Sequence, residues 1–78
     1  MKTADEIEHW LVQRVASELD LAPNEIDVSV PVERYGLDSR TAACLSGDLE
    51  DWLGRSLPAT LIWDYPTIEE ISEHLKES

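Results

Sequence analysis

Residues 33–67, ERYGLDSRTAACLSGDLEDWLGRSLPATLIWDYPT, contain the clearest helical pattern of the chain. Within it, apolar side chains recur at three- and four-residue intervals, the spacing that gathers them on one face of an α-helix. Gly54 follows the last of them, at the position where a helix usually stops. The pattern predicts a helix from about Ser39 to Leu53. Its expected buried face consists of Ala42, Leu45, Leu49, Trp52 and Leu53.

The start of this helix depends on which residue caps it. Gly36 can adopt a positive φ angle, so the chain can turn sharply into the helix. Asp38 is as good a cap as serine, and its carboxylate suits the positive end of the helix dipole. With Asp38 as the cap, the Ser39 hydroxyl would stay free, and an anionic group bonded to it would lie beside unpaired N–H groups. Taken alone, however, Asp-Ser before a helix is far more often a plain cap.

Two further helices are expected on either side of this stretch. Residues 3–6, TADE, form a capping-box pattern, and the helix that they open should end near Asp20. Residues 67–70, TIEE, form a second capping box, which opens the last helix. The expected buried faces are Ile7, Trp10, Leu11, Val15 and Leu19 in the first helix, and Ile68, Ile71 and Leu75 in the last.

The connections offer no pair of strands. Val28, Val30 and Val32 alternate as in a strand, but no comparable segment is available to pair with them, so residues 21–37 are expected to be a loop. Residues 58–63, PATLIW, are expected to form a short helical turn for the same reason. The predicted fold class is all-α, a four-helix bundle with a long first loop and a short third helix. With 78 residues, the chain has room for one domain, residues 1–78.

Composition narrows the class of partner. Hydrophobic residues make up 42% of the chain, which is enough for a core, and the net charge is −11. This charge repels nucleic acid and anionic lipid and favours basic partner surfaces. No apolar run approaches the roughly 20 residues that a membrane-spanning helix needs, so no direct membrane insertion is expected. Cys44 has no partner for an intramolecular disulfide, and the acidic first residues do not resemble a secretory signal. A cytoplasmic protein is expected.

The sequence around Ser39 resembles a known family. YGLDS (35–39), an amphipathic helix and then LPATLIWDYPTIEEISEHL (57–75) are similar to the acyl carrier domains of polyketide synthases. In that family, glycine, any residue, aspartate and serine surround the serine that is modified. The Leu-Pro and Asp-x-Pro-Thr elements stand at family-like distances downstream, and the resemblance covers nearly the entire chain.

The resemblance implies that Ser39 receives a 4'-phosphopantetheine arm from coenzyme A, delivered by a separate phosphopantetheinyl transferase that uses magnesium. The arm's thiol would carry an acyl chain as a thioester to a ketosynthase or another acyl-processing enzyme, and tethering would raise its local concentration there. The domain would be a non-catalytic monomer. Residues 45–69 are similar to carriers that follow fatty-acyl-AMP ligases, which implies a fatty acyl cargo.

The same resemblance implies that partners dock around the serine, with Asp38 as a recognition neighbour for the transferase. The family commonly has an apolar residue directly after the serine, whereas this chain has Arg40. Residues 38–55 contain four acidic residues and two arginines. The net charge of the recognition face is therefore less negative than that of the whole chain. The expected docking surface consists of Tyr35, Gly36, Leu37, Arg40, Ala43, Cys44, Gly47, Asp48 and Asp51.

Other reactive side chains have simpler interpretations. Cys44 has no base beside it and is expected to be a small, partly packed residue. His9 and His74 lack neighbours at ligand spacing, so both are expected at the surface and no metal site is predicted. The large aromatics are expected to fill the core, with Trp52 the most exposed of them. They are Trp10, Trp52 and Trp63.

Two alternatives to an acyl carrier stay open. One is a peptidyl carrier for amino acids, and the other is an unmodified acidic helical adaptor that binds a basic partner. A hydrolase with Ser39 as nucleophile is poorly supported, because Leu37 and Thr41 stand where the G-x-S-x-G elbow has glycines.

Overall fold

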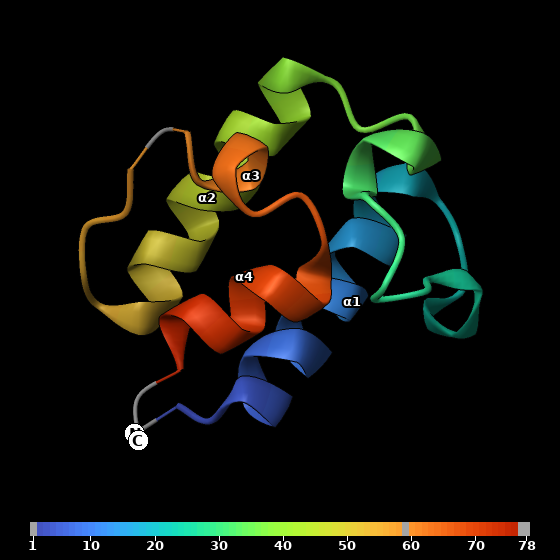
Figure 1. Cartoon of the computed structure of the whole chain (residues 1–78). Helices are drawn as coiled ribbons and strands as arrows, with labels where there is room; N and C mark the ends of the chain where they lie inside the picture. Colours follow the sequence, from blue (N-terminus) through green and yellow to red (C-terminus); the bar gives the residue numbers. More distant parts are fainter. Residues whose placement is uncertain (1, 59, 77–78) are drawn as a thin grey trace.

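The computed structural model describes residues 2–58 and 60–76, and the described part of the chain is helical without a strand. The α-helices are α1 (Ala4–Leu19), α2 (Ser39–Leu53), α3 (Leu61–Asp64) and α4 (Ile68–Leu75). Two 3₁₀ turns, η1 (Pro23–Glu25) and η2 (Val32–Tyr35), lie in the long connection between α1 and α2 (Figure 1). The predicted four-helix architecture is confirmed.

The helix ends follow the caps that the sequence contains. Thr3 and Glu6 form the capping box of α1, and Asp20 ends that helix with a left-handed backbone at φ 58°. Thr67 accepts a hydrogen bond from the Glu70 N–H at the start of α4. There the expected reciprocal bond takes another form, because the Glu70 carboxylate accepts from the Thr67 hydroxyl at 3.0 Å.

One core joins all four helices and the long connection. Its members are spaced at helical intervals within α1, α2 and α4, so each of these helices buries one face. The buried apolar residues are Ile7, Leu11, Val15, Ala16, Ile26, Val32, Leu37, Ala42, Leu45, Leu49, Leu61, Ile62, Ile68, Ile71 and Leu75.

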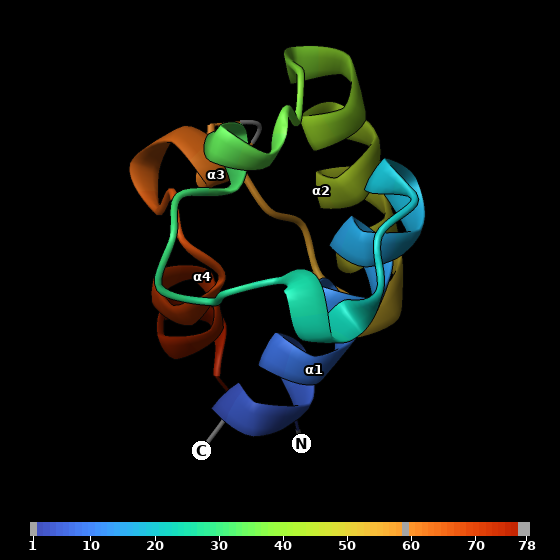
Figure 2. The same ribbon diagram turned by 90° about the vertical axis from the view of Figure 1, so that its right-hand side faces the viewer.

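The long connection is fixed to the start of α4. The Val32 N–H donates to the Pro66 carbonyl at 2.9 Å, and the Glu69 N–H donates to the Val28 carbonyl at 3.1 Å. This tie holds η2 in place, and η2 leads directly into α2. In both views η2, α3 and the first turn of α2 lie together, away from the start of α1 and the end of α4 (Figures 1 and 2).

The expectation that all three tryptophans fill the core is wrong. Trp63 is 53% exposed, more than Trp52, because α3 has a single turn and its inward positions are taken by Leu61 and Ile62. Trp10 and Trp52 are half-buried at the edge of the core, where their rings stack with centroids 5.1 Å apart.

No helix in the described ranges is long and apolar enough to cross a membrane.

Candidate functional site

Ser39 is the first residue of α2 and its side chain is exposed. Asp38 caps the helix, because its carboxylate accepts a hydrogen bond from the Thr41 N–H at 2.8 Å. The Asp38 carbonyl also accepts the first intrahelical bond, from the Ala42 N–H. Across residues 2–58 and 60–76, no group is hydrogen-bonded to the Ser39 hydroxyl. The hydroxyl is therefore outside the capping arrangement and accessible from solvent.

The charge beside Ser39 is stable over the physiological pH range. Hydrogen bonds from Thr41, first from its backbone N–H and then from its side chain, lower the pKa of Asp38 below its ordinary value. The ionised carboxylate also lies at the positive end of the α2 dipole. Asp38 is thus a fixed anion that does the structural work at this helix end.

The loop before Asp38 is held from both sides. Tyr35 is half-buried, and its hydroxyl accepts a hydrogen bond from the Asp27 N–H at 2.7 Å. Gly36 is exposed with φ 88°, in the left-handed region that favours glycine. Leu37 is only 6% exposed, so its side chain belongs to the core and not to the predicted docking surface. The burial of Leu37 anchors the chain directly before the cap.

Beyond Ser39, the first turns of α2 present one arginine and several small residues to solvent. Arg40, Ala43 and Cys44 are exposed, and Gly47 is half-buried with open space where a Cβ would be. These positions recur at one- and four-residue steps, so they share one side of the helix. We call Ser39, Arg40, Ala43, Cys44 and Gly47 the serine face. The exposure of Cys44 corrects the expectation that it is partly packed.

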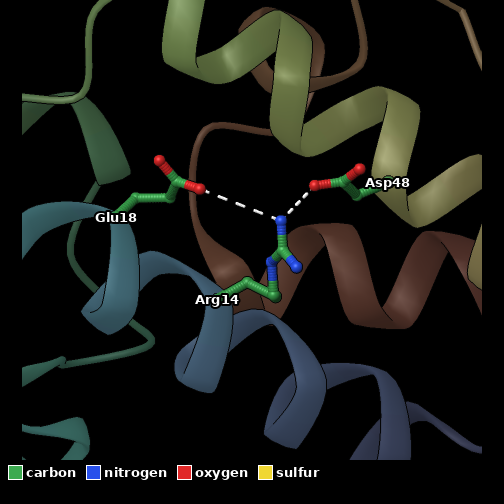
Figure 3. Close-up of polar contacts among 3 residues, drawn as sticks. All are labelled: Arg14, Glu18 and Asp48. Atoms are coloured by element: carbon green, nitrogen blue, oxygen red, sulfur yellow. Dashed lines mark hydrogen bonds and ion pairs between the residues drawn. The ribbon is translucent and has the colours of Figure 1, made fainter.

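The acidic residues of α2 differ in their surroundings. Asp48 forms a salt bridge with Arg14 of α1, and the same guanidinium lies 3.8 Å from the Glu18 carboxylate (Figure 3). Glu50 accepts a hydrogen bond from the Leu57 N–H at 2.9 Å, which fixes the turn after the helix. Within the described residues, Asp51 is the α2 acid with no intrachain partner.

Arg14 belongs to a second cluster that joins α1 to α2, which we call the clasp and define as Trp10, Arg14, Asp48 and Trp52. The Arg14 guanidinium lies 5.6 Å from the Trp10 ring centroid, and the rings of Trp10 and Trp52 stack on each other. The Lys2 ammonium lies 4.7 Å from the Trp52 ring centroid. The clasp was not predicted from the sequence. One signal for it was present in the sequence, because residues four apart are neighbours on one side of a helix. Trp10 and Arg14 have this spacing in α1, and Asp48 and Trp52 have it in α2.

The two histidines were the other candidates for metal ligands or catalysts. His9 and His74 are exposed, as expected, and the His74 ring stacks on Tyr65 with centroids 4.1 Å apart. Within residues 2–58 and 60–76, no three His, Cys, Asp or Glu side chains form a group that could hold a metal ion.

Comparisons with known proteins agree on one family. Residues 9–75 match the family model described as the phosphopantetheine attachment site. The chain is 31% identical over 70 residues to a phenolphthiocerol/phthiocerol polyketide synthase of Mycobacterium tuberculosis, covering 90% of this chain but 4% of that protein. It is 29% identical over 73 residues to the acyl carrier protein TtuC of Teredinibacter turnerae, covering 94% of this chain and 84% of the relative.

The fold agrees with the same group of proteins. A free-standing peptidyl carrier protein from Acinetobacter baumannii superposes with a TM-score of 0.90 at 40% identity, covering 96% of this chain and 94% of that one. The matched segment of the family model runs from α1 to the last residue of α4, so it includes the whole serine face.

Proposed function

The chain belongs to the family of phosphopantetheine attachment domains, and from this premise we propose that Ser39 is its attachment residue. Members of the family are carrier proteins that hold 4'-phosphopantetheine covalently, and this chain is related to the carriers of polyketide synthases. One observation supports the assignment to Ser39: its hydroxyl is exposed at the start of α2 while Asp38 does the capping.

The residues present fit the group. Attachment requires a hydroxyl that no internal bond occupies, and Ser39 meets this requirement in the described structure. The Ser39 oxygen would bond to the phosphorus of the pantetheine phosphate as the nucleotide half of coenzyme A leaves. The hydroxyl proton would pass to a base of the transferase. The phosphodiester would then lie at the positive end of the α2 dipole, which favours an anion. When bound, the arm supplies the terminal thiol that carries the cargo.

The full proposal is an acyl carrier in which residues 1–78 form one domain and catalyse no reaction themselves. The cargo is a fatty acyl or polyketide chain, held as a thioester. The partners are a phosphopantetheinyl transferase, an acyl-loading enzyme of the fatty-acyl-AMP ligase kind, and a ketosynthase or another acyl-processing enzyme. Carrier domains of polyketide synthases generally work with transferases and ketosynthases, which supports these two members of the set. We further propose a monomer located in the cytoplasm.

The serine face is the proposed docking surface, with Tyr35 and Gly36 at one edge. Asp38 remains the proposed recognition neighbour for the transferase. Asp48 and Asp51 lie farther along α2, and the salt bridge to Arg14 leaves Asp48 less free to contact a partner than Asp51.

The experiment that tests attachment is an intact-mass measurement. The chain is incubated with coenzyme A, Mg²⁺ and a broad-specificity phosphopantetheinyl transferase. It should gain the mass of one phosphopantetheine, and Ser39→Ala should gain none. Ser56→Ala, which removes an exposed serine after α2, is the matched control and should be modified normally. No gain by the unmodified sequence, while a known carrier is modified alongside it, would leave the acidic adaptor as the better interpretation.

A peptidyl carrier is the second candidate function, because the Acinetobacter neighbour with a TM-score of 0.90 is a peptidyl carrier protein. The discriminating experiment offers the phosphopantetheinylated chain an adenylated fatty acid or an adenylated amino acid, each with its loading enzyme. Loading of the fatty acid alone is expected. Preferential loading of the amino acid would reverse the assignment of cargo.

A further inference from the structure

The clasp borders a groove between α1 and the C-terminal half of α2. The groove has a volume of about 450 Å³, and its exposed surface is mainly apolar. The residues that line it are Glu6, His9, Trp10, Gln13, Arg14 and Trp52. A hollow of this volume and character lies within the range of sites that bind another molecule.

The shape of the groove fits a helical segment. Trp10 and Trp52 are half-buried and their ring planes are 13° apart, so the two indoles form one continuous apolar surface. The lining residues of α1 recur at three- and four-residue steps over residues 6–14, so the groove follows that helix for about 12 Å, or roughly two turns. A partner helix lying in such a groove places a large apolar side chain against the indole rings.

The groove lies in an acidic part of the chain. Residues 2–20 contain five acids and two cations, a net charge of −3, whereas residues 33–47 around the serine contain two of each. Arg14 lines the groove, but its guanidinium is shared by the carboxylates of Asp48 and Glu18, which more than balance its charge. Charge complementarity therefore favours a partner segment that carries Lys or Arg next to its apolar face.

The groove is remote from the proposed attachment residue. Trp52 follows Ser39 by thirteen residues, which places it roughly 20 Å farther along α2 and roughly 140° around the helix. The described residues that line the groove are all different from those of the serine face. A segment held in the groove therefore leaves the Ser39 hydroxyl exposed.

We propose that the groove holds a basic amphipathic helix of a partner protein, as a second interface that leaves the serine face open. The partner presents a large apolar side chain to the rings of Trp10 and Trp52, with Lys or Arg facing the acids of α1. Such a contact keeps the chain beside its partner while other proteins act at Ser39, and so raises the effective concentration of the serine there. This inference goes beyond the proposed function, because binding in the groove requires no modification of Ser39.

The test uses a synthetic helical peptide of about 14 residues, or roughly four turns, built from leucine and lysine with the leucines on one face. The nitrogen-15-labelled chain is titrated with this peptide, and the backbone amide shifts are followed by NMR. The largest shifts are expected in residues 6–14 and at Trp52, with small shifts in residues 39–47. A scrambled peptide of the same composition should bind about tenfold more weakly, because its leucines no longer share a face. Replacing the lysines by glutamate should also weaken binding.

Two double variants test the role of charge. Glu6→Gln with Glu18→Gln removes two acids of α1 near the groove and should weaken peptide binding about fivefold. Glutamine can still serve in the capping box at position 6. Glu33→Gln with Glu69→Gln, which removes two exposed acids outside the groove, is the matched control and should change the affinity by less than about twofold. Thermal unfolding of both variants, followed by circular dichroism, checks that the bundle is intact.

Three results of the titration would overturn the inference. One is absence of binding at about 1 mM peptide, and another is an equal loss of affinity in the two double variants. The third is a set of largest shifts within residues 39–47. Dimerisation of the chain alone, with shifts at the groove residues on concentration, would assign the groove to a second copy and would also overturn the proposal.

Modification of Ser39 supplies a separate readout. With the groove saturated by the peptide, a broad-specificity transferase should modify the chain at a rate within about twofold of normal, because the two surfaces do not overlap. Competition between the peptide and the transferase would contradict the second interface. Failure of the chain to gain mass without peptide would remove the proposed function, whereas binding in the groove would still stand.

Discussion

The two ends of α2 use the same kinds of side chain for different purposes. At its C-terminal half, Trp52 stacks on Trp10 and Asp48 binds Arg14, so an aromatic and an acid are engaged in joining α2 to α1. At its N-terminal end, Ser39 and Arg40 are exposed, Asp38 contacts only its own helix, and Trp63 of the adjacent α3 faces solvent. The aromatic and charged side chains that join α1 to α2 thus lie away from the serine, whereas the polar side chains next to the serine are exposed.

The largest expected effect compares two tryptophans. Trp52→Ala removes a half-buried ring and its stacking on Trp10, and should lower the free energy of unfolding by about 2 kcal/mol. Trp63→Ala removes an exposed ring and should change this free energy by less than about 0.5 kcal/mol. Urea unfolding followed by circular dichroism measures both. Equal losses of unfolding free energy in the two variants would mean that Trp63 stabilises the fold as much as Trp52 does. The proposed difference between the two ends of α2 would then be wrong.

The tryptophans also show what could be predicted from sequence. The buried face of α2 could be predicted, because its fifteen residues repeat the apolar period several times. Asp38 and Gly54 mark the two ends of the helix. The orientation of Trp63 could not be predicted, because the four residues of α3 are too few to show a repeating apolar pattern. Local signals therefore placed Ser39 at the start of a helix but could not separate the exposed tryptophan from the stacked pair.

Contacts between helices could not be predicted from the sequence, for a different reason. Asp48 was predicted to face partners because of the resemblance to acyl carrier domains. Its pairing with Arg14 depends on how α1 and α2 are positioned against each other, which no local pattern specifies. In the same way, Leu37 could be read as a loop residue, but its burial follows from the tie between the long connection and α4.

A smaller effect compares two acids of α2. A double-mutant cycle with Arg14→Met and Asp48→Asn should give a coupling energy of about 0.5 kcal/mol, because both side chains are more than a third exposed. The parallel cycle of Arg14→Met with Asp51→Asn should give none. Methionine keeps an apolar stem next to Trp10, so packing is largely preserved. Urea unfolding measures both cycles, and the first coupling should weaken in about 1 M NaCl.

A coupling between Arg14 and Asp51 as large as that with Asp48 would show that α2 contributes diffuse charge and not a specific bridge. In that case the division between engaged and available acids would not hold, and Asp48 would regain its place in a docking surface.

The smallest effect concerns Asp38, whose interactions are confined to the serine end of α2. Hydrogen bonds from Thr41 lower its pKa in the folded state below the unfolded value of about 3.9. Its ionised form therefore stabilises the fold above about pH 4, and this contribution is lost as the pH falls through the lowered pKa. An asparagine at this position would still cap the helix but would not titrate. The stability difference between the original chain and Asp38→Asn should thus shrink between about pH 5 and pH 2.

Thermal unfolding at several pH values measures this difference, with Ser39→Ala as the control that should follow the pH profile of the original chain. The control isolates the cap, because Ser39 is adjacent to Asp38 but its hydroxyl takes no part in the hydrogen bond to the Thr41 N–H. If Ser39→Ala were instead destabilised at every pH while Asp38→Asn showed no pH-dependent difference, Ser39 would be the cap, and its hydroxyl would not be free for attachment.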